Sequence, residues 1–86
     1  MAVIVPSWFK GRQGKAEEVR PGLVKLAAPN LREWFVGIRR LDNGSWQVFV
    51  RSEPDSVDAA AVEVDPMPVQ EAWDAAFEVY RNHVII

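Results

Sequence analysis

Residues 34–53, WFVGIRRLDNGSWQVFVRSE, form the stretch that decides the fold. Two β-branched and aromatic runs flank Asn43-Gly44, which is a strong hairpin signal. A two-residue turn at Asn43-Gly44 would mix apolar and charged side chains on both faces of the hairpin. A three-residue loop over 42–44, with Gly44 in the left-handed conformation, separates them. Because a one-residue slip exchanges the two faces, the cleaner separation predicts the three-residue loop.

The predicted register gives the hairpin two distinct faces. The paired residues are Ile38 with Val48, Val36 with Val50, and Arg40 with Trp46. The apolar face carries Trp34, Val36, Ile38, Trp46, Val48 and Val50. The opposite face carries the candidate binding residues Phe35, Gly37, Arg39, Gln47, Phe49 and Arg51. A solvated sheet face should not hold two phenylalanines between arginines, so we expect this face to contact something.

Further strands are expected on both sides of the hairpin. Residues 57–65 alternate and predict a third strand, which makes 31–65 a three-stranded meander. Residues 23–28 and 2–5 predict one or two short N-terminal strands. Residues 7–22 are expected to be irregular, although 16–20 could form a helical turn before Pro21-Gly22.

The C-terminal third predicts one amphipathic helix over about 66–82. Asp65 can cap it, and Pro66 suits a first turn because its missing N–H is harmless there. Its apolar stripe consists of Val69, Trp73, Ala76, Phe77 and Tyr80. We therefore predict an α+β fold, a mostly antiparallel sheet with this helix packed on one face. The tail 84–86 is either a last short strand or an anchor on a neighbour.

The bulk composition indicates one small globular domain, 1–86. Residues 1–40 hold eight basic and three acidic residues, whereas 41–86 hold two basic and nine acidic ones. Such segregation fits halves that neutralise each other, or separate basic and acidic surfaces. The chain has no cysteine and no apolar run of membrane-spanning length. The opening residues lack a basic leader pattern, so we expect a cytoplasmic protein without membrane contact.

No pattern in the chain predicts catalysis, a metal or a cofactor. Gly11-Arg12-Gln13-Gly14 resembles the loop by which KH domains clamp nucleic acid, but it lacks the flanking helices and is expected to be a surface loop. Glu53, Asp55 and Asp58 crowd one turn at a spacing that matches no calcium loop. His83 is the only histidine, and no base with orienting groups accompanies it. We expect a non-enzymatic protein.

The hairpin and the helix together resemble the AP2 and integrase-type DNA-binding fold. Residues 36–39, 44–51 and the segment EAWDAAFEVY match its first two strands and its alanine-rich helix. The resemblance implies that Gly37, Arg39 and Arg51 would face DNA. Phe49 departs from the family by taking a polar position of that surface, and the third strand supplies acids where phosphates need cations.

The first hypothesis for function is therefore a small binding domain, either with a protein partner or as a homodimer. The homodimer would be built on the outer sheet face or on the tail 84–86, because one helix covers only one face of a sheet. The alternative is a DNA-binding domain that reads DNA with the sheet face. The sequence names neither the partner nor the pathway.

Overall fold

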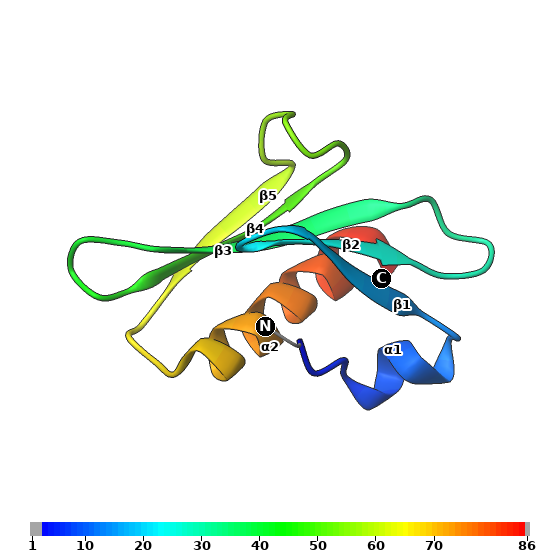
Figure 1. The fold of residues 1–86 in the computed structure, drawn as a ribbon, viewed down its shortest axis with the longest axis horizontal. Coiled ribbons are helices and arrows are strands. Elements are labelled where there is room, and N and C mark those ends of the chain that lie inside the picture. The colour runs from blue at the N-terminus through cyan, green and yellow to red at the C-terminus, as the bar shows by residue number, and fades with distance from the viewer. Residues whose placement is uncertain (1–2, 86) are drawn as a thin grey trace.

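The sheet is an antiparallel meander of five strands in the order β1-β2-β3-β4-β5 (Figure 1). The strands are β1 (Lys15–Arg20), β2 (Leu23–Ala27), β3 (Trp34–Arg40), β4 (Trp46–Arg51) and β5 (Ala60–Val64). Two helices, α1 (Ser7–Gly11) and α2 (Val69–Tyr80), lie on the same side of the sheet, and a π-helical turn, η1 (Arg81–Ile85), continues α2. The computed structural model describes residues 3–85. The predicted α+β fold is confirmed.

The β3–β4 hairpin has the predicted register. Ile38 pairs with Val48 and Arg40 with Trp46. The Leu41 N–H donates to the Ser45 carbonyl at 2.8 Å, and Gly44 has a φ of +88°. Glycine adopts this left-handed conformation at little energetic cost, whereas a residue with a Cβ adopts it at a higher cost. The three-residue loop is confirmed.

The main core lies between α2 and the apolar face of the hairpin. Trp73, Phe77 and Tyr80 have no exposed surface, and neither do Val48 and Val50. The remaining buried members of this core are Phe9, Val24, Leu26, Val36, Ile38, Trp46, Ala72 and Ala76. Four residues of the predicted apolar stripe therefore pack in the core, Trp73, Ala76, Phe77 and Tyr80, whereas Val69 at the start of the helix is exposed.

Helix α1 adds an aromatic corner to the same layer. Its Phe9 is fully buried, with ring centroids 5.8 Å from Phe77 and 5.7 Å from Tyr80. Trp8 stacks on Tyr80 at 6.4 Å. The segment before β1 thus helps to cover the helix side of the sheet, and it leaves the outer face open.

The N-terminal quarter differs from the prediction. Residues 16–20 are part of β1, because the Pro21-Gly22 turn folds them back onto β2, and Gly22 takes a φ of +82°. Pairing with β2 outweighs the helix propensity of Ala-Glu-Glu. Residues 3–5 form no strand, and residues 1–2 of the predicted first strand lie outside the described range.

The C-terminal segment also differs in detail from the prediction. Helix α2 begins at Val69, after Pro68, whose carbonyl accepts from the N–H groups of Glu71 and Ala72. A residue that precedes proline is disfavoured in the helical region, so Pro68 moves the start beyond Pro66. Val84 and Ile85 lie in η1 and pack against the main core of their own chain, so they form no strand. The last residue of the predicted tail, 86, lies outside the described range.

Trp73 should be the most costly core side chain of α2 to truncate. Trp73→Ala should lower the free energy of unfolding by about 3–5 kcal/mol, because it leaves a cavity between helix and sheet. Trp73→Phe should cost far less, since the indole Nε1 has no hydrogen-bond partner within residues 3–85. Denaturant titration measures both, with exposed Asp74→Ala as the control. A melting point for Trp73→Ala within a few degrees of wild type would contradict this packing.

Tyr80 should make stability depend on pH in alkaline solution. Burial raises the pKa of this hydroxyl, and the Arg12 charge lowers it by less. The unfolded chain therefore ionises first, near pH 10, so stability is complete below about pH 10 and falls as pH rises further. Tyr80→Phe should remove this part of the decline. Because Tyr80 is the only tyrosine, tyrosinate absorbance during unfolding at several pH values tests the assignment directly. Equal alkaline slopes for the two proteins would refute it.

Candidate functional site

The six candidate residues lie together on the outer face of β3 and β4, opposite α2. The register places Phe35 beside Arg51, Gly37 beside Phe49, and Arg39 beside Gln47. Phe35 and Phe49 are nonetheless buried, only 7% and 5% exposed, in a small cluster with Leu23 of β2. The outer face therefore carries its own small core rather than an exposed apolar patch.

Phe49 is covered by side chains of its own sheet. Its ring lies over Gly37, so closely that a Cβ at this position would overlap ring atoms. The guanidinium carbon of Arg51 lies 4.5 Å from the ring centroid, and that of Arg39 lies 5.2 Å away. Arginine attracts the face of an aromatic ring and covers apolar surface with its stem. The two arginines thus cover Phe49 on the outer face, where no second helical layer packs.

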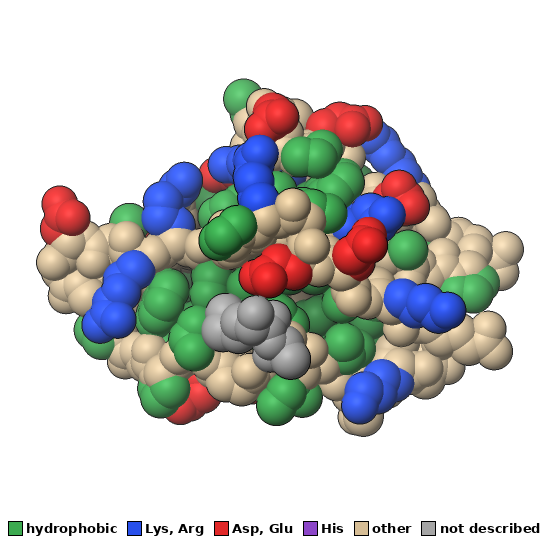
Figure 2. Space-filling view, in the orientation of Figure 1, with side chains coloured by type: hydrophobic (Ala, Val, Ile, Leu, Met, Phe, Trp, Pro, Cys, Tyr) green, Lys and Arg blue, Asp and Glu red, His purple; other side chains and the backbone are tan. Residues whose placement is uncertain are grey.

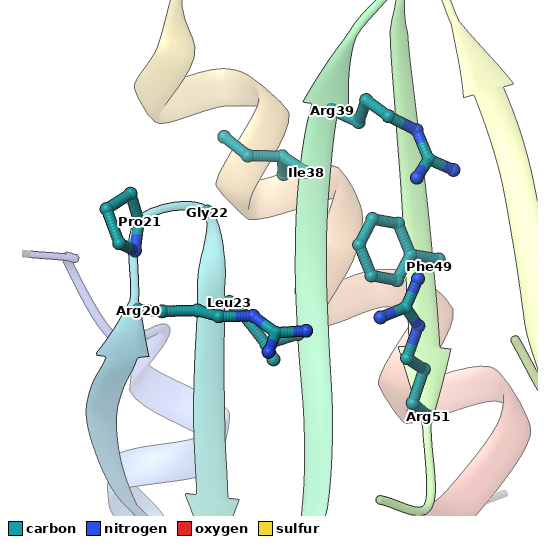
Figure 3. A pocket seen from close by; sticks show the side chains of 8 residues that line it. All are labelled: Arg20, Pro21, Gly22, Leu23, Ile38, Arg39, Phe49 and Arg51. Atoms are coloured by element: carbon teal, nitrogen blue, oxygen red, sulfur yellow. The ribbon is translucent and has the colours of Figure 1, made fainter. Parts of the chain in front are cut away.

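A pocket of about 380 Å³ opens beside Phe49 on this face (Figure 3). Its lining consists of Arg20, Pro21, Gly22, Leu23, Ile38, Arg39, Phe49 and Arg51. Arg20 extends from the end of β1 across Leu23 toward β3 (Figure 3). Three arginines from three strands therefore line one hollow.

The turn after β4 holds two of these arginines in place. Arg51 Nε donates to Asp58 at 2.7 Å, and Arg20 Nη1 donates to Asp55 at 2.9 Å. The Pro54 carbonyl accepts from both, from Arg51 Nη1 at 3.0 Å and from Arg20 Nη2 at 3.1 Å. Asp55 and Asp58 of the acidic turn therefore each pair with an arginine. Within residues 3–85, no group of acids or histidines is arranged to hold a metal.

Arg39 has a different environment. It donates to the neutral side-chain oxygen of Gln47, and no carboxylate oxygen in the described part of the chain lies within 4 Å of it. Figure 2 shows Lys/Arg and Asp/Glu side chains interspersed along the upper side of the molecule, above the sheet. Arg39 thus differs from the other two arginines of the pocket, each of which pairs with a carboxylate.

The remaining sequence candidates lie elsewhere. Residues 11–13 of the Gly11–Gly14 segment are exposed, as expected for a surface loop, and only Gly14 packs against the Phe9 ring. The His83 ring lies 5.5 Å from Trp34. Arg20, Pro21 and Leu23 were not predicted at the site. Only the Pro21-Gly22 turn signal pointed to a chain reversal there, and the helical reading of 16–20 concealed it.

Comparison with known proteins gives this chain no family: no family model, no curated protein and no solved structure matches it. Every helix within residues 3–85 falls short of the length and apolar character that crossing a membrane requires. The outer-face pocket is therefore the feature that bears on function.

Gly37 should be required for the shape of this face. In Gly37→Ala the new methyl group would overlap the Phe49 ring and lie 2.8 Å from the Gly22 carbonyl oxygen. We expect a loss of about 1–3 kcal/mol of unfolding free energy, as for overpacking, together with a displaced Phe49 ring. Gly11→Ala is the matched control, because nothing lies within 4 Å of the position that its new Cβ would take. Denaturant titration that finds the two variants equally stable would show that Phe49 does not depend on Gly37.

Proposed function

We propose that this chain is a non-enzymatic binding domain whose outer sheet face takes an anionic group. The observation that carries the proposal is the convergence of Arg20, Arg39 and Arg51 on one pocket. A guanidinium offers five N–H donors and no acceptor, so such a cluster selects negatively charged acceptors. No carboxylate oxygen among residues 3–85 lies within 4 Å of the Arg39 guanidinium, which leaves this cation available to a partner.

Preorganisation supports this proposal. The contacts of Arg20 and Arg51 with the turn 53–58 fix their side chains before any ligand arrives. The Arg51–Asp58 pair is only 17% and 24% exposed, so solvent screens it less than an exposed pair. Fixed donors lower the entropy that binding must overcome. Each of these guanidiniums retains N–H groups beyond the two hydrogen bonds that it makes.

The pocket also indicates the chemistry of the anion. Arginine matches the planar, two-oxygen edge of a carboxylate or a phosphate better than a point charge does. Leu23 and Phe49 line the pocket but are almost fully buried, so the arginines supply most of its accessible donors, and about 380 Å³ suits a small group or one side chain of a larger partner. We therefore propose a carboxylate or phosphate group as the ligand.

DNA remains a second candidate, because no helix within residues 3–85 covers the outer face of β3 and β4, which carries Arg39. A duplex would bring a row of phosphates past the pocket, and the outward-facing Glu63 and the exposed Asp55 would repel those that Arg39 does not reach, which weighs against DNA relative to a single small anion. Self-association, a protein partner and a cytoplasmic location also stay proposals. Phe35 and Phe49 give a dimer on the outer face no support, because they are buried within their own chain.

Arg39 and Arg40 provide a matched test of anion binding. They are neighbours in β3 on opposite faces, Arg39 over Phe49 and Arg40 over Trp46. Arg39→Gln should weaken binding about ten-fold or more, the loss of one charge-assisted contact, while Arg40→Gln removes the same charge and should change it little. Titrating inorganic phosphate and citrate separately, with the amide shifts of Arg20, Gly22 and Leu23 as the readout, distinguishes phosphate from carboxylate.

Three outcomes would count against the proposal. Amide shifts that do not saturate with either anion would show that the pocket does not bind them specifically. Equal losses in Arg39→Gln and Arg40→Gln would reduce the effect to net charge. Sequence-selective binding of a DNA duplex at physiological salt, lost in Arg39→Gln, would favour the DNA-binding candidate instead.

A further inference from the structure

The two edges of the sheet are protected very differently. The edge strand β1 carries Lys15, Glu17, Glu18 and Arg20, and its register is broken between Glu18 and Arg20. Charged side chains and a bulge are the usual means by which a protein prevents its edge from pairing with another chain. The other edge strand, β5, has the sequence AAVEV and pairs with β4 in unbroken register. It carries one charge, at Glu63.

The helix side of β5 is also left partly uncovered. Val62 pairs with Val48 and points to the helix side, yet it is 48% exposed, whereas Val48 is fully buried. A hollow of about 250 Å³ lies there between β5 and the end of α2, lined by Ala60, Val62, Val79, Asn82 and His83. Figure 1 shows β5 at the free edge of the sheet, with its upper part extending away from α2.

The main-chain groups of β5 are arranged for a further strand. Hydrogen-bonding partners alternate along an antiparallel ladder, so a residue that faces one neighbour is followed by one that faces the other. Counting from the Leu41–Ser45 hydrogen bond along the β3–β4 and β4–β5 registers, the N–H and C=O of Ala61 and Glu63 point away from β4. These donors and acceptors form the open edge.

We propose that β5 pairs with β5 of a second copy of this chain, antiparallel and about a twofold axis at Val62. In this register Ala61 of each copy exchanges hydrogen bonds with Glu63 of the other. The two Val62 side chains meet as a non-hydrogen-bonded pair, where opposite side chains are closest. Each Glu63 lies opposite an alanine rather than another carboxylate, so like charges are not paired directly. The arrangement is self-complementary, as a twofold interface requires.

The size of the contact sets its strength. A strand of five residues with one central valine lies at the lower end of specific interfaces, which begin at roughly 1,200 Å² of total buried area. The association should therefore be weak and reversible, with a dissociation constant on the order of 10–100 μM. It joins two sheets into one and leaves both outer-face pockets accessible, so it does not depend on the anion proposal.

Val62 and Val19 form a matched pair of test positions on the two edges, 48% and 43% exposed. Sedimentation equilibrium over about 1–500 μM should show a monomer–dimer equilibrium for the wild-type chain. Val62→Lys should weaken it at least ten-fold, because an edge lysine disfavours strand pairing, and Val19→Lys should leave it unchanged. Far-UV circular dichroism of each variant checks that the monomer is folded.

A second variant acts on the main chain alone. Ala61→Pro removes the Ala61 N–H, which points away from β4, and should also weaken the dimer at least ten-fold. If Val62→Lys does not fold, Ala61→Pro by itself tests whether β5 forms the dimer contact. A wild-type chain that stays monomeric to about 500 μM would overturn the proposal. So would dimers that Val19→Lys weakens as much as Val62→Lys, or that survive in Ala61→Pro.

Discussion

The structure depends on the register of the β3–β4 hairpin, which the loop at Gly44 fixes. The Leu41–Ser45 hydrogen bond closes this loop, and Gly44 supplies the left-handed residue within it. Because side chains alternate along a strand, this one registration assigns Val36 and Val48 to the helix side and Arg39 and Phe49 to the outer side. A slip by one residue would turn arginines toward Trp73. The core and the outer pocket are thus two consequences of the same loop.

A single helical layer leaves the apolar residues on the outer face of the sheet without a helix to cover them. One layer can cover only one side of a sheet, yet β2, β3 and β4 each present an apolar residue outward, Leu23, Phe35 and Phe49. Arginine stems and guanidiniums cover Phe49, and Gly37 makes room for its ring. A guanidinium meets a ring with its flat face and an anion with the N–H groups along its edge. The same side chains can therefore stabilise this face and still bind a ligand.

Short-range sequence patterns predicted the elements that depend on residues close together in the chain, namely the hairpin and the C-terminal helix. The turn chemistry around Gly44 predicted the hairpin, which is found as expected, and the apolar spacing of α2 predicted the buried stripe, which is found except for the exposed Val69. Residues 16–20 were predicted as a helical turn and not as a strand, because Ala-Glu-Glu favours a helix by itself. The strand forms through pairing with β2. Arg20 could not be assigned to the site from the sequence, since its partners Pro54 and Asp55 lie 34 and 35 residues away. Contacts at that separation follow from the assembled sheet.

The segregation of charge along the chain is only partly cancelled by folding. Within residues 3–85, the Arg20–Asp55 ion pair joins the basic first half to the acidic second half, and Asp55 is largely exposed. Lys25 pairs instead with Glu17 and Glu33 of its own half, and Arg51 with Asp58 of its own. Much of the basic excess of residues 1–40 is therefore not neutralised by the acidic half. Arg12 and Arg40 of this basic half lie on the helix side of the sheet, near Tyr80 and Trp46, whereas Arg20 and Arg39 lie on the outer side, so folding divides the excess positive charge between the two sides.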